Sequence, residues 1–175
     1  MSSVLTLILL CYFFVISYGA RILGIFMTPS YSHQIVYQPI WKELSLKGHQ
    51  VTIYTPNPLN NKSLTNLTEY DLGFSYDLVK DVYFNDSRTP SENVKLVFEI
   101  FENIFEKQMS HKYLQDLVKN VKNESYDLLL VEYMWQSYYA FKDIFNVPMV
   151  GLTSLPLTMF SSDALGLDKH PVLDP

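Results

Sequence analysis

The residue of this sequence with the clearest capacity for chemistry is His33, which follows an apolar run, Arg21–Met27, and the polar loop Thr28–Ser32. A helix is predicted to begin close to His33, and the partial positive charge at a helix N-terminus disfavours imidazolium. We therefore expect a ring that is neutral and basic near pH 7. A neutral imidazole can take a proton from a hydroxyl group. The alternative is a solvent-exposed loop histidine with no catalytic role.

The rest of the sequence argues against a nucleotide-binding loop and against a metal site. The loop before His33 contains neither G-x-G-x-x-G nor a P-loop, so we expect no nucleotide-binding site in this part of the chain. His49 follows a glycine that closes a helix, His111 falls between predicted helices, and His170 lies in the tail. No pair of histidines has metal-ligand spacing, and we predict no metal site.

Alternating strands and helices must position these residues. Strands are predicted at Arg21–Met27, Gln50–Thr55, Tyr126–Val131 and Met149–Thr153. Helices are predicted at His33–Leu46, Ser91–Met109, Tyr113–Val121 and Trp135–Phe145. Because Pro39 lies inside the first helix, we expect a start near Val36 or a kink. The polar stretch Asn57–Pro90 contains one strand-like piece, Gly73–Leu78. The alternation predicts an α/β fold, a Rossmann-like parallel sheet with helices on both faces.

In such sheets ligands bind beyond the carboxyl ends of the strands. The residues to inspect there are Thr28–His33, Pro56, Glu132–Trp135 and Thr153–Pro156. The helix predicted at Ser91–Met109 also carries a stripe of aromatic and aliphatic side chains. That stripe is either core or one wall of an apolar ligand site.

The first residues are typical of a secretory signal peptide. Val4–Ile16 is uncharged and apolar, and small residues precede a predicted cleavage after Gly19. The segment Met1–Ser3 carries no Lys or Arg, and the alternative is a buried first helix of a cytosolic protein. The one cysteine, Cys11, lies in this leader, so the mature chain can form no disulfide, thiol nucleophile or Cys-ligated zinc site.

The glycosylation motifs and the overall charge are consistent with entry into the secretory pathway. Asn-x-Ser/Thr motifs occur at Asn61, Asn66, Asn85 and Asn123. We therefore expect the endoplasmic reticulum lumen. The net charge of −5 argues against a nucleic-acid partner, and 48% hydrophobic composition can supply a core without disulfides.

Two blocks, ARILGIFMTPSYSHQIVYQPIWKELSLKGHQVTIYTP and YDLLLVEYMWQSYYAFKDIFNVPMVGLTSLP, resemble the animal UDP-glycosyltransferases, especially those of insects. The resemblance implies a GT-B fold, in which an N-terminal Rossmann-like half binds the acceptor and a C-terminal half binds the UDP-sugar. Residues 1–19 would be the signal peptide and 20–175 the acceptor-binding domain. The sequence stops before the family's donor-binding half and transmembrane anchor, so we expect the chain alone to be inactive.

The resemblance also implies roles for individual residues. His33 matches the family's catalytic base, and Glu132 matches the Asp that orients it, although Glu is one methylene longer; a solvated strand-end carboxylate is the alternative for Glu132. The reaction would invert the configuration of the transferred hexose. No cofactor is implied beyond the co-substrate, which for an insect enzyme would be UDP-glucose more readily than UDP-glucuronate. Residues that would line a site for a small lipophilic alcohol or phenol are Tyr31, Phe101, Phe105, Tyr133, Met134 and Trp135.

A different class of function stays open at this point. The chain could be a non-enzymatic secreted or luminal module that binds a small apolar ligand. A variant is a truncated regulatory partner that pairs with full-length transferases, so both homodimers and heterodimers could form.

Overall fold

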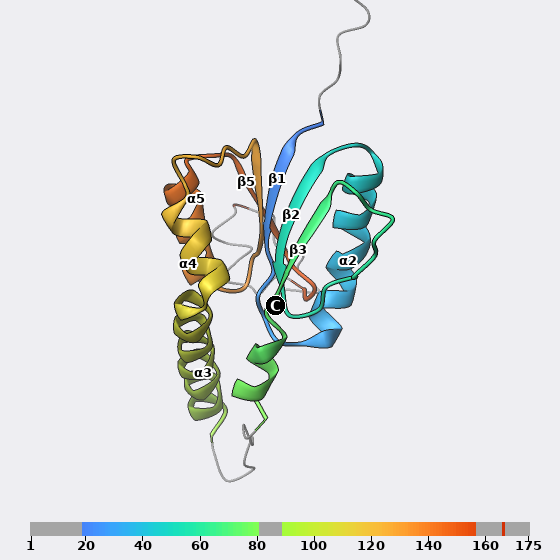
Figure 1. Ribbon diagram of the computed structural model, residues 1–175. Helices are drawn as coiled ribbons and strands as arrows, with labels where there is room; N and C mark the ends of the chain where they lie inside the picture. Colours follow the sequence, from blue (N-terminus) through green and yellow to red (C-terminus); the bar gives the residue numbers. More distant parts are fainter. Residues whose placement is uncertain (1–18, 81–88, 157–165, 167–175) are drawn as a thin grey trace, which may run out of the picture.

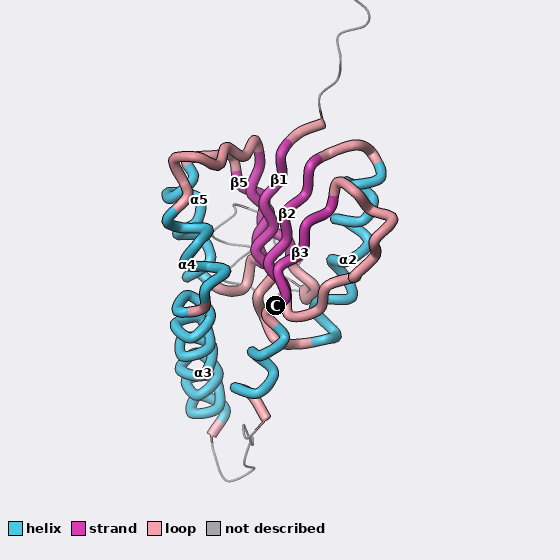
Figure 2. The backbone as a smooth tube through the Cα atoms, viewed as in Figure 1, coloured by secondary structure: helices cyan, strands magenta, loops and turns pink. Residues whose placement is uncertain are grey.

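The computed structural model describes residues 19–80, 89–156 and 166, and it contains one sheet of five parallel strands (Figures 1 and 2). The strands are β1 (Arg21–Ile25), β2 (Gln50–Thr55), β3 (Leu67–Asp71), β4 (Leu128–Glu132) and β5 (Met149–Leu152). Their order in the sheet is β3-β2-β1-β4-β5, and every neighbouring pair is parallel. The predicted Rossmann-like α/β fold is confirmed.

Helices cover both faces of the sheet (Figure 1). They are α2 (Tyr31–Leu46), α3 (Pro90–Ser110), α4 (Lys112–Lys119) and α5 (Ala140–Phe145), with 3-10 helices η1 (Gly73–Leu78) and η2 (Gln136–Tyr139). The core on the α2 face contains Phe26, Tyr37, Trp41 and Ile53. The core on the other face is built by strand residues together with Leu114, Leu117, Tyr138 and Phe141. Neighbouring strand residues thus alternate between two separate cores.

Helix α2 begins earlier than the sequence predicts. It starts at Tyr31 and runs through Pro39, so the predicted start near Val36 is wrong. Pro39 has no N–H for the carbonyl oxygen of Ile35, but both residues are exposed, and water can satisfy that carbonyl. The face that packs on the sheet buries Tyr37 and Trp41, which are one turn apart.

Gly48 ends the connection from α2 to β2 with a φ of +90°. A Cβ added there would meet nothing within 4 Å, so a substitution acts through the backbone alone. We expect Gly48→Ala to lower the free energy of unfolding by about 1–2 kcal/mol, the cost of a left-handed conformation for a residue with a Cβ. Gly48→Asn should cost less, because Asn tolerates this region better. Urea unfolding of both variants measures the effect; an alanine variant as stable as the parent would contradict it.

The segment between β2 and α3 was predicted least well. Gly73–Leu78 is a 3-10 helix, so its assignment as a strand was wrong. The strand in this region is β3, which lies at the sheet edge and pairs with β2. Its sequence, LTEYD, is only half-buried and has no apolar run. Its one large aromatic, Tyr70, stacks on Tyr54 of β2 with ring centroids 4.5 Å apart.

Two helix boundaries also differ from prediction. Helix α3, predicted from Ser91, begins at Pro90, and Thr89 caps it in a capping box with Glu92. The helix predicted at Trp135–Phe145 is divided into η2 and α5, and Trp135 precedes it with an extended backbone. Within the described residues, no helix is both long and apolar enough to cross a bilayer. Residues 1–18, Asn85 and His170 lie outside the described part.

Candidate active site

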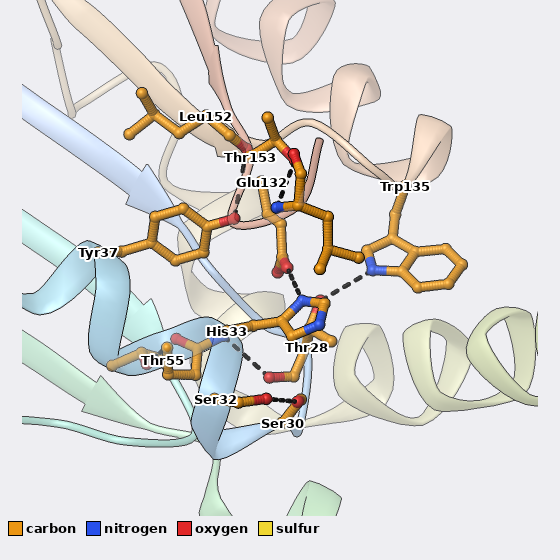
Figure 3. Close-up of polar contacts among 12 residues, drawn as sticks. Thr28, Ser30, Ser32, His33, Tyr37, Thr55, Glu132, Trp135, Leu152 and Thr153 are labelled. Atoms are coloured by element: carbon orange, nitrogen blue, oxygen red, sulfur yellow. Dashed lines mark hydrogen bonds and ion pairs between the residues drawn. The ribbon is translucent and has the colours of Figure 1, made fainter. Parts of the chain in front are cut away.

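The site lies between β1 and β4, where the order in which successive strands are added to the sheet reverses. Neighbouring strands β1 and β4 lead at their carboxyl ends to α2, which packs on one face, and to η2, which packs on the other. Such a switch point leaves a crevice in which ligands of α/β proteins bind. His33, in the first turn of α2, and Glu132, the last residue of β4, meet there: His33 Nδ1 lies 3.1 Å from Glu132 Oε1 (Figure 3).

The alternation of β4 explains why Glu132 reaches His33. Leu130 packs in the core on the α2 face, while Leu129 and Val131 pack in the other core. Two residues after Leu130, Glu132 therefore points to the α2 face. Its side chain is fully buried, and 19% of the His33 side chain is exposed. A buried carboxylate needs a cationic or donating partner, and His33 supplies it.

The charge of Glu132 governs the ionisation of His33. The hydrogen bond to Glu132 raises the pKa of His33 above its usual 6.5, burial lowers it, and the negative charge of Glu132 raises it further; the net direction is upward. The effect of the helix N-terminus, which favours the neutral ring, is therefore outweighed in the direction of this pKa. A helix dipole contributes about 0.3–1 kcal/mol, whereas a hydrogen bond to a charged group contributes about 1.5–3 kcal/mol.

Buried polar side chains fix the loop that leads to His33. The indole Nε1 of Trp135 donates to Thr28 Oγ1 at 2.9 Å, and Gln34 Nε2 donates to the Thr28 carbonyl at 2.9 Å. Gln34 Oε1 in turn accepts from Thr55 Oγ1 at 2.8 Å. From α3, Gln108 Nε2 donates to the carbonyl oxygen before Thr28 at 2.6 Å. Neither glutamine is predicted from the sequence, because the only local signal is a polar residue on the apolar face of a helix.

An aromatic cavity of about 640 Å³ adjoins this pair. Of the predicted acceptor residues, those that line it are Phe101, Phe105, Tyr133, Met134 and Trp135. Trp135 stacks on Phe101 with ring centroids 3.9 Å apart. Tyr31 is not among the lining residues: it is the first residue of α2 and 61% exposed, so its placement in the acceptor site is corrected. Glu102 is the one charged side chain among the described lining residues.

Neither His33 nor Glu132 lines the cavity, but residues next to this pair in the sheet do. Tyr133 directly follows Glu132, and Thr153 directly follows Leu152, the residue paired with Glu132 in the sheet; both line the cavity. In Figure 3, Glu132 and Trp135 lie on different sides of the His33 ring.

The other histidines and glycosylation motifs within the described residues lie apart from this pair. His49 Nδ1 accepts from the backbone N–H of Ala20 at 3.0 Å, and His111 caps α4, so both have structural roles. Asn61 and Asn123 are exposed and Asn66 is half-buried. No group of three metal-ligating side chains occurs in residues 19–80 and 89–156.

Proteins similar in sequence belong to one class. No family model matches the chain. UDP-glycosyltransferase UGT4 of Dactylopius coccus is 29% identical over 144 residues, covering 81% of this chain and 28% of the relative. The ecdysteroid UDP-glucosyltransferase of Spodoptera littoralis nuclear polyhedrosis virus is 27% identical over 180 residues, covering 91% of this chain and 34% of the relative. UDP-glycosyltransferase UGT5 of Dactylopius coccus is 28% identical over 169 residues, covering 91% and 31%.

A solved structure shows a more distant likeness. It is Phytolacca americana UGT2 complexed with UDP-2fluoro-glucose and pterostilbene, with a TM-score of 0.47, 14% identity, and coverage of 77% of this chain and 30% of that chain. The sequence relatives establish that the chain is a homologue of the UDP-glycosyltransferases. It spans about a third of the length of the curated relatives it matches.

Proposed function

We propose that this chain is the acceptor-binding part of a UDP-glycosyltransferase, which transfers a hexosyl group from a UDP-sugar to a hydroxyl group of a small lipophilic acceptor. His33 is the general base, and Glu132 orients it. The observation that carries this proposal is the 3.1 Å contact between His33 Nδ1 and the buried Glu132, at the switch point of the sheet and beside an aromatic cavity. The UDP-sugar is held mainly by a second domain of the complete enzyme.

The contact with Glu132 determines which ring nitrogen can act. With Nδ1–H donated to Glu132, the lone pair of the neutral ring lies on Nε2, so Nε2 is the nitrogen left to accept a proton. Nε2 takes the hydroxyl proton as the acceptor oxygen bonds to the anomeric carbon. The bond from that carbon to the phosphate oxygen breaks, and UDP leaves with the electron pair. Attack from the opposite face inverts the configuration, and Glu132 stabilises the imidazolium that forms.

The cavity supports a lipophilic acceptor. Its volume suits a drug-sized ligand, and its stacked walls, Phe101 and Trp135, favour flat rings. Glu102 disfavours acceptors that carry a carboxylate or phosphate. Several relatives are named glucosyltransferases, which supports UDP-glucose as the donor.

Truncation of the cavity wall provides a test of acceptor binding. Phe101→Ala removes the ring that stacks on Trp135, and we expect the Kd for a small phenol to rise about 5- to 30-fold, the equivalent of roughly 1–2 kcal/mol. Tyr31→Ala is the matched control, because it also removes an aromatic ring but lies outside the cavity. Isothermal titration of both variants gives the comparison. Weaker binding in Tyr31→Ala alone would place the acceptor site elsewhere.

Turnover is the decisive test of the proposed activity. The full-length protein that carries this sequence should transfer a hexose from UDP-glucose or UDP-glucuronate to a small phenol, with inversion seen by NMR of the product. Phenol binding without transfer from either donor would overturn the proposal and favour a binding module.

A further inference from the structure

The contact with His33 occupies only one oxygen of Glu132. The other oxygen, Oε2, is buried and has no hydrogen-bond partner among the described residues. A buried carboxylate oxygen without a donor is costly and would leave the carboxylate free to turn. Because this carboxylate orients the imidazole of His33, the groups around Oε2 affect the orientation of that ring.

Two hydroxyl groups lie at the same end of the sheet with unmet bonding capacity. Tyr37 follows His33 by one turn on the same face of α2. Its hydroxyl has one long contact, 3.5 Å, to the carbonyl oxygen of Leu152, the residue paired with Glu132 (Figure 3). Ser154, two residues beyond Leu152, has a buried Oγ without a partner in the described part of the chain.

The Tyr37 hydroxyl reaches the carboxyl ends of β4 and β5, because it contacts Leu152, which pairs with Glu132. Burial and the negative charge of Glu132 raise the pKa of Tyr37 above its usual value. Tyr37 and Glu132 therefore interact electrostatically. The titratable groups that face Glu132 are His33 and Tyr37 from α2 and the buried Tyr138 from η2, whose pKa is also raised by burial and by Glu132.

We propose that Tyr37 and Ser154 are positioning residues, whose hydroxyl groups hold Oε2 of Glu132 through one shared water molecule. A polar gap too wide for a direct hydrogen bond is commonly bridged by water, and a buried water typically makes about three hydrogen bonds. Three atoms are available here: Glu132 Oε2, Tyr37 Oη and Ser154 Oγ. The arrangement fixes the carboxylate against His33. The role of this arrangement in catalysis rests on the proposed function, but its effect on the pKa of His33 does not.

The pKa of His33, measured by NMR on the whole protein, is the direct readout. Tyr37→Phe keeps the ring that packs on Phe26 at a centroid distance of 4.8 Å and removes only the hydroxyl. A carboxylate that loses a donor holds the shared proton more tightly, so the pKa of His33 should rise by roughly 0.3–1 pH unit. Ser154→Ala should shift it in the same direction by less. The matched control is Tyr54→Phe, which removes a buried hydroxyl in the core on the opposite face.

The outcomes separate this inference from the proposed function. A pKa of His33 that is unchanged in both Tyr37→Phe and Ser154→Ala would overturn it, because a purely packing role would alter stability and leave the titration unchanged. A crystal structure with one water within hydrogen-bond distance of Glu132, Tyr37 and Ser154 would support it. A protein group bonded to Oε2 instead would overturn it. Full turnover in a His33→Ala variant would refute the proposed function and leave the NMR result intact.

Discussion

Replacement of His33 by alanine is expected to lower turnover about 10²- to 10⁴-fold in the complete enzyme, the usual contribution of a positioned general base. Without the imidazole, the acceptor hydroxyl must lose its proton to water as it attacks. The affinity for the UDP-sugar should change little, because we place the donor in another domain. The measurement is the initial rate against phenol concentration, with donor affinity determined separately by titration.

The control for this variant is His111→Asn. His111 caps α4, and Asn is an effective N-cap, so this change removes an imidazole without removing the cap. We expect it to retain the turnover of the parent. Turnover near the parent level in His33→Ala would exclude His33 as the base; equal losses in both variants would indicate a general loss of structure.

Local sequence patterns predicted the elements that position the site. Strand β2 has the predicted bounds, Gln50–Thr55, because a β-branched and aromatic segment lies between a glycine turn and a proline. The pairing of His33 with Glu132 came from the resemblance to a family, and the structure brings the two side chains into contact. The edge strand Leu67–Asp71 was missed because half-buried edge strands need no apolar run.

The remaining features depend on contacts between residues distant in sequence. The direction of the pKa of His33 could not be predicted from the helix alone, because it is determined by a carboxylate 99 residues away. Gln34 and Gln108 resemble ordinary helix residues until β1 and its loop are packed against them. Tyr31 is aromatic and close to His33 in sequence, but its position in the helix turns it to solvent.

Glu132→Gln tests the orienting carboxylate through both rate and pH dependence. The parent His33 has a raised pKa, so the neutral base, and with it the rate, should increase as pH rises above 6.5 through that raised value. An amide removes the negative charge and leaves only a neutral hydrogen-bond acceptor, while burial still lowers this pKa. The rate profile of Glu132→Gln should therefore move to lower pH. Its plateau should fall about 10- to 100-fold, because an amide cannot stabilise imidazolium as a carboxylate does.

Glu132→Asp is the matched comparison, because it keeps the charge and shortens the side chain by one methylene. We expect the pKa of His33 to stay raised and the plateau rate to remain within a few-fold of the parent, since the resemblance places Asp at this position in the family. Initial rates between about pH 5.5 and 9.5, with the NMR titration of His33 in each variant, distinguish charge from geometry. If Glu132→Gln retains both the parent profile and the parent rate while His33→Ala is inactive, His33 acts without the carboxylate. A Glu132→Asp variant as impaired as Glu132→Gln would show that the extra methylene of Glu132 is required to reach the imidazole of His33. The geometry of this pair would then differ from the one that the family resemblance implies.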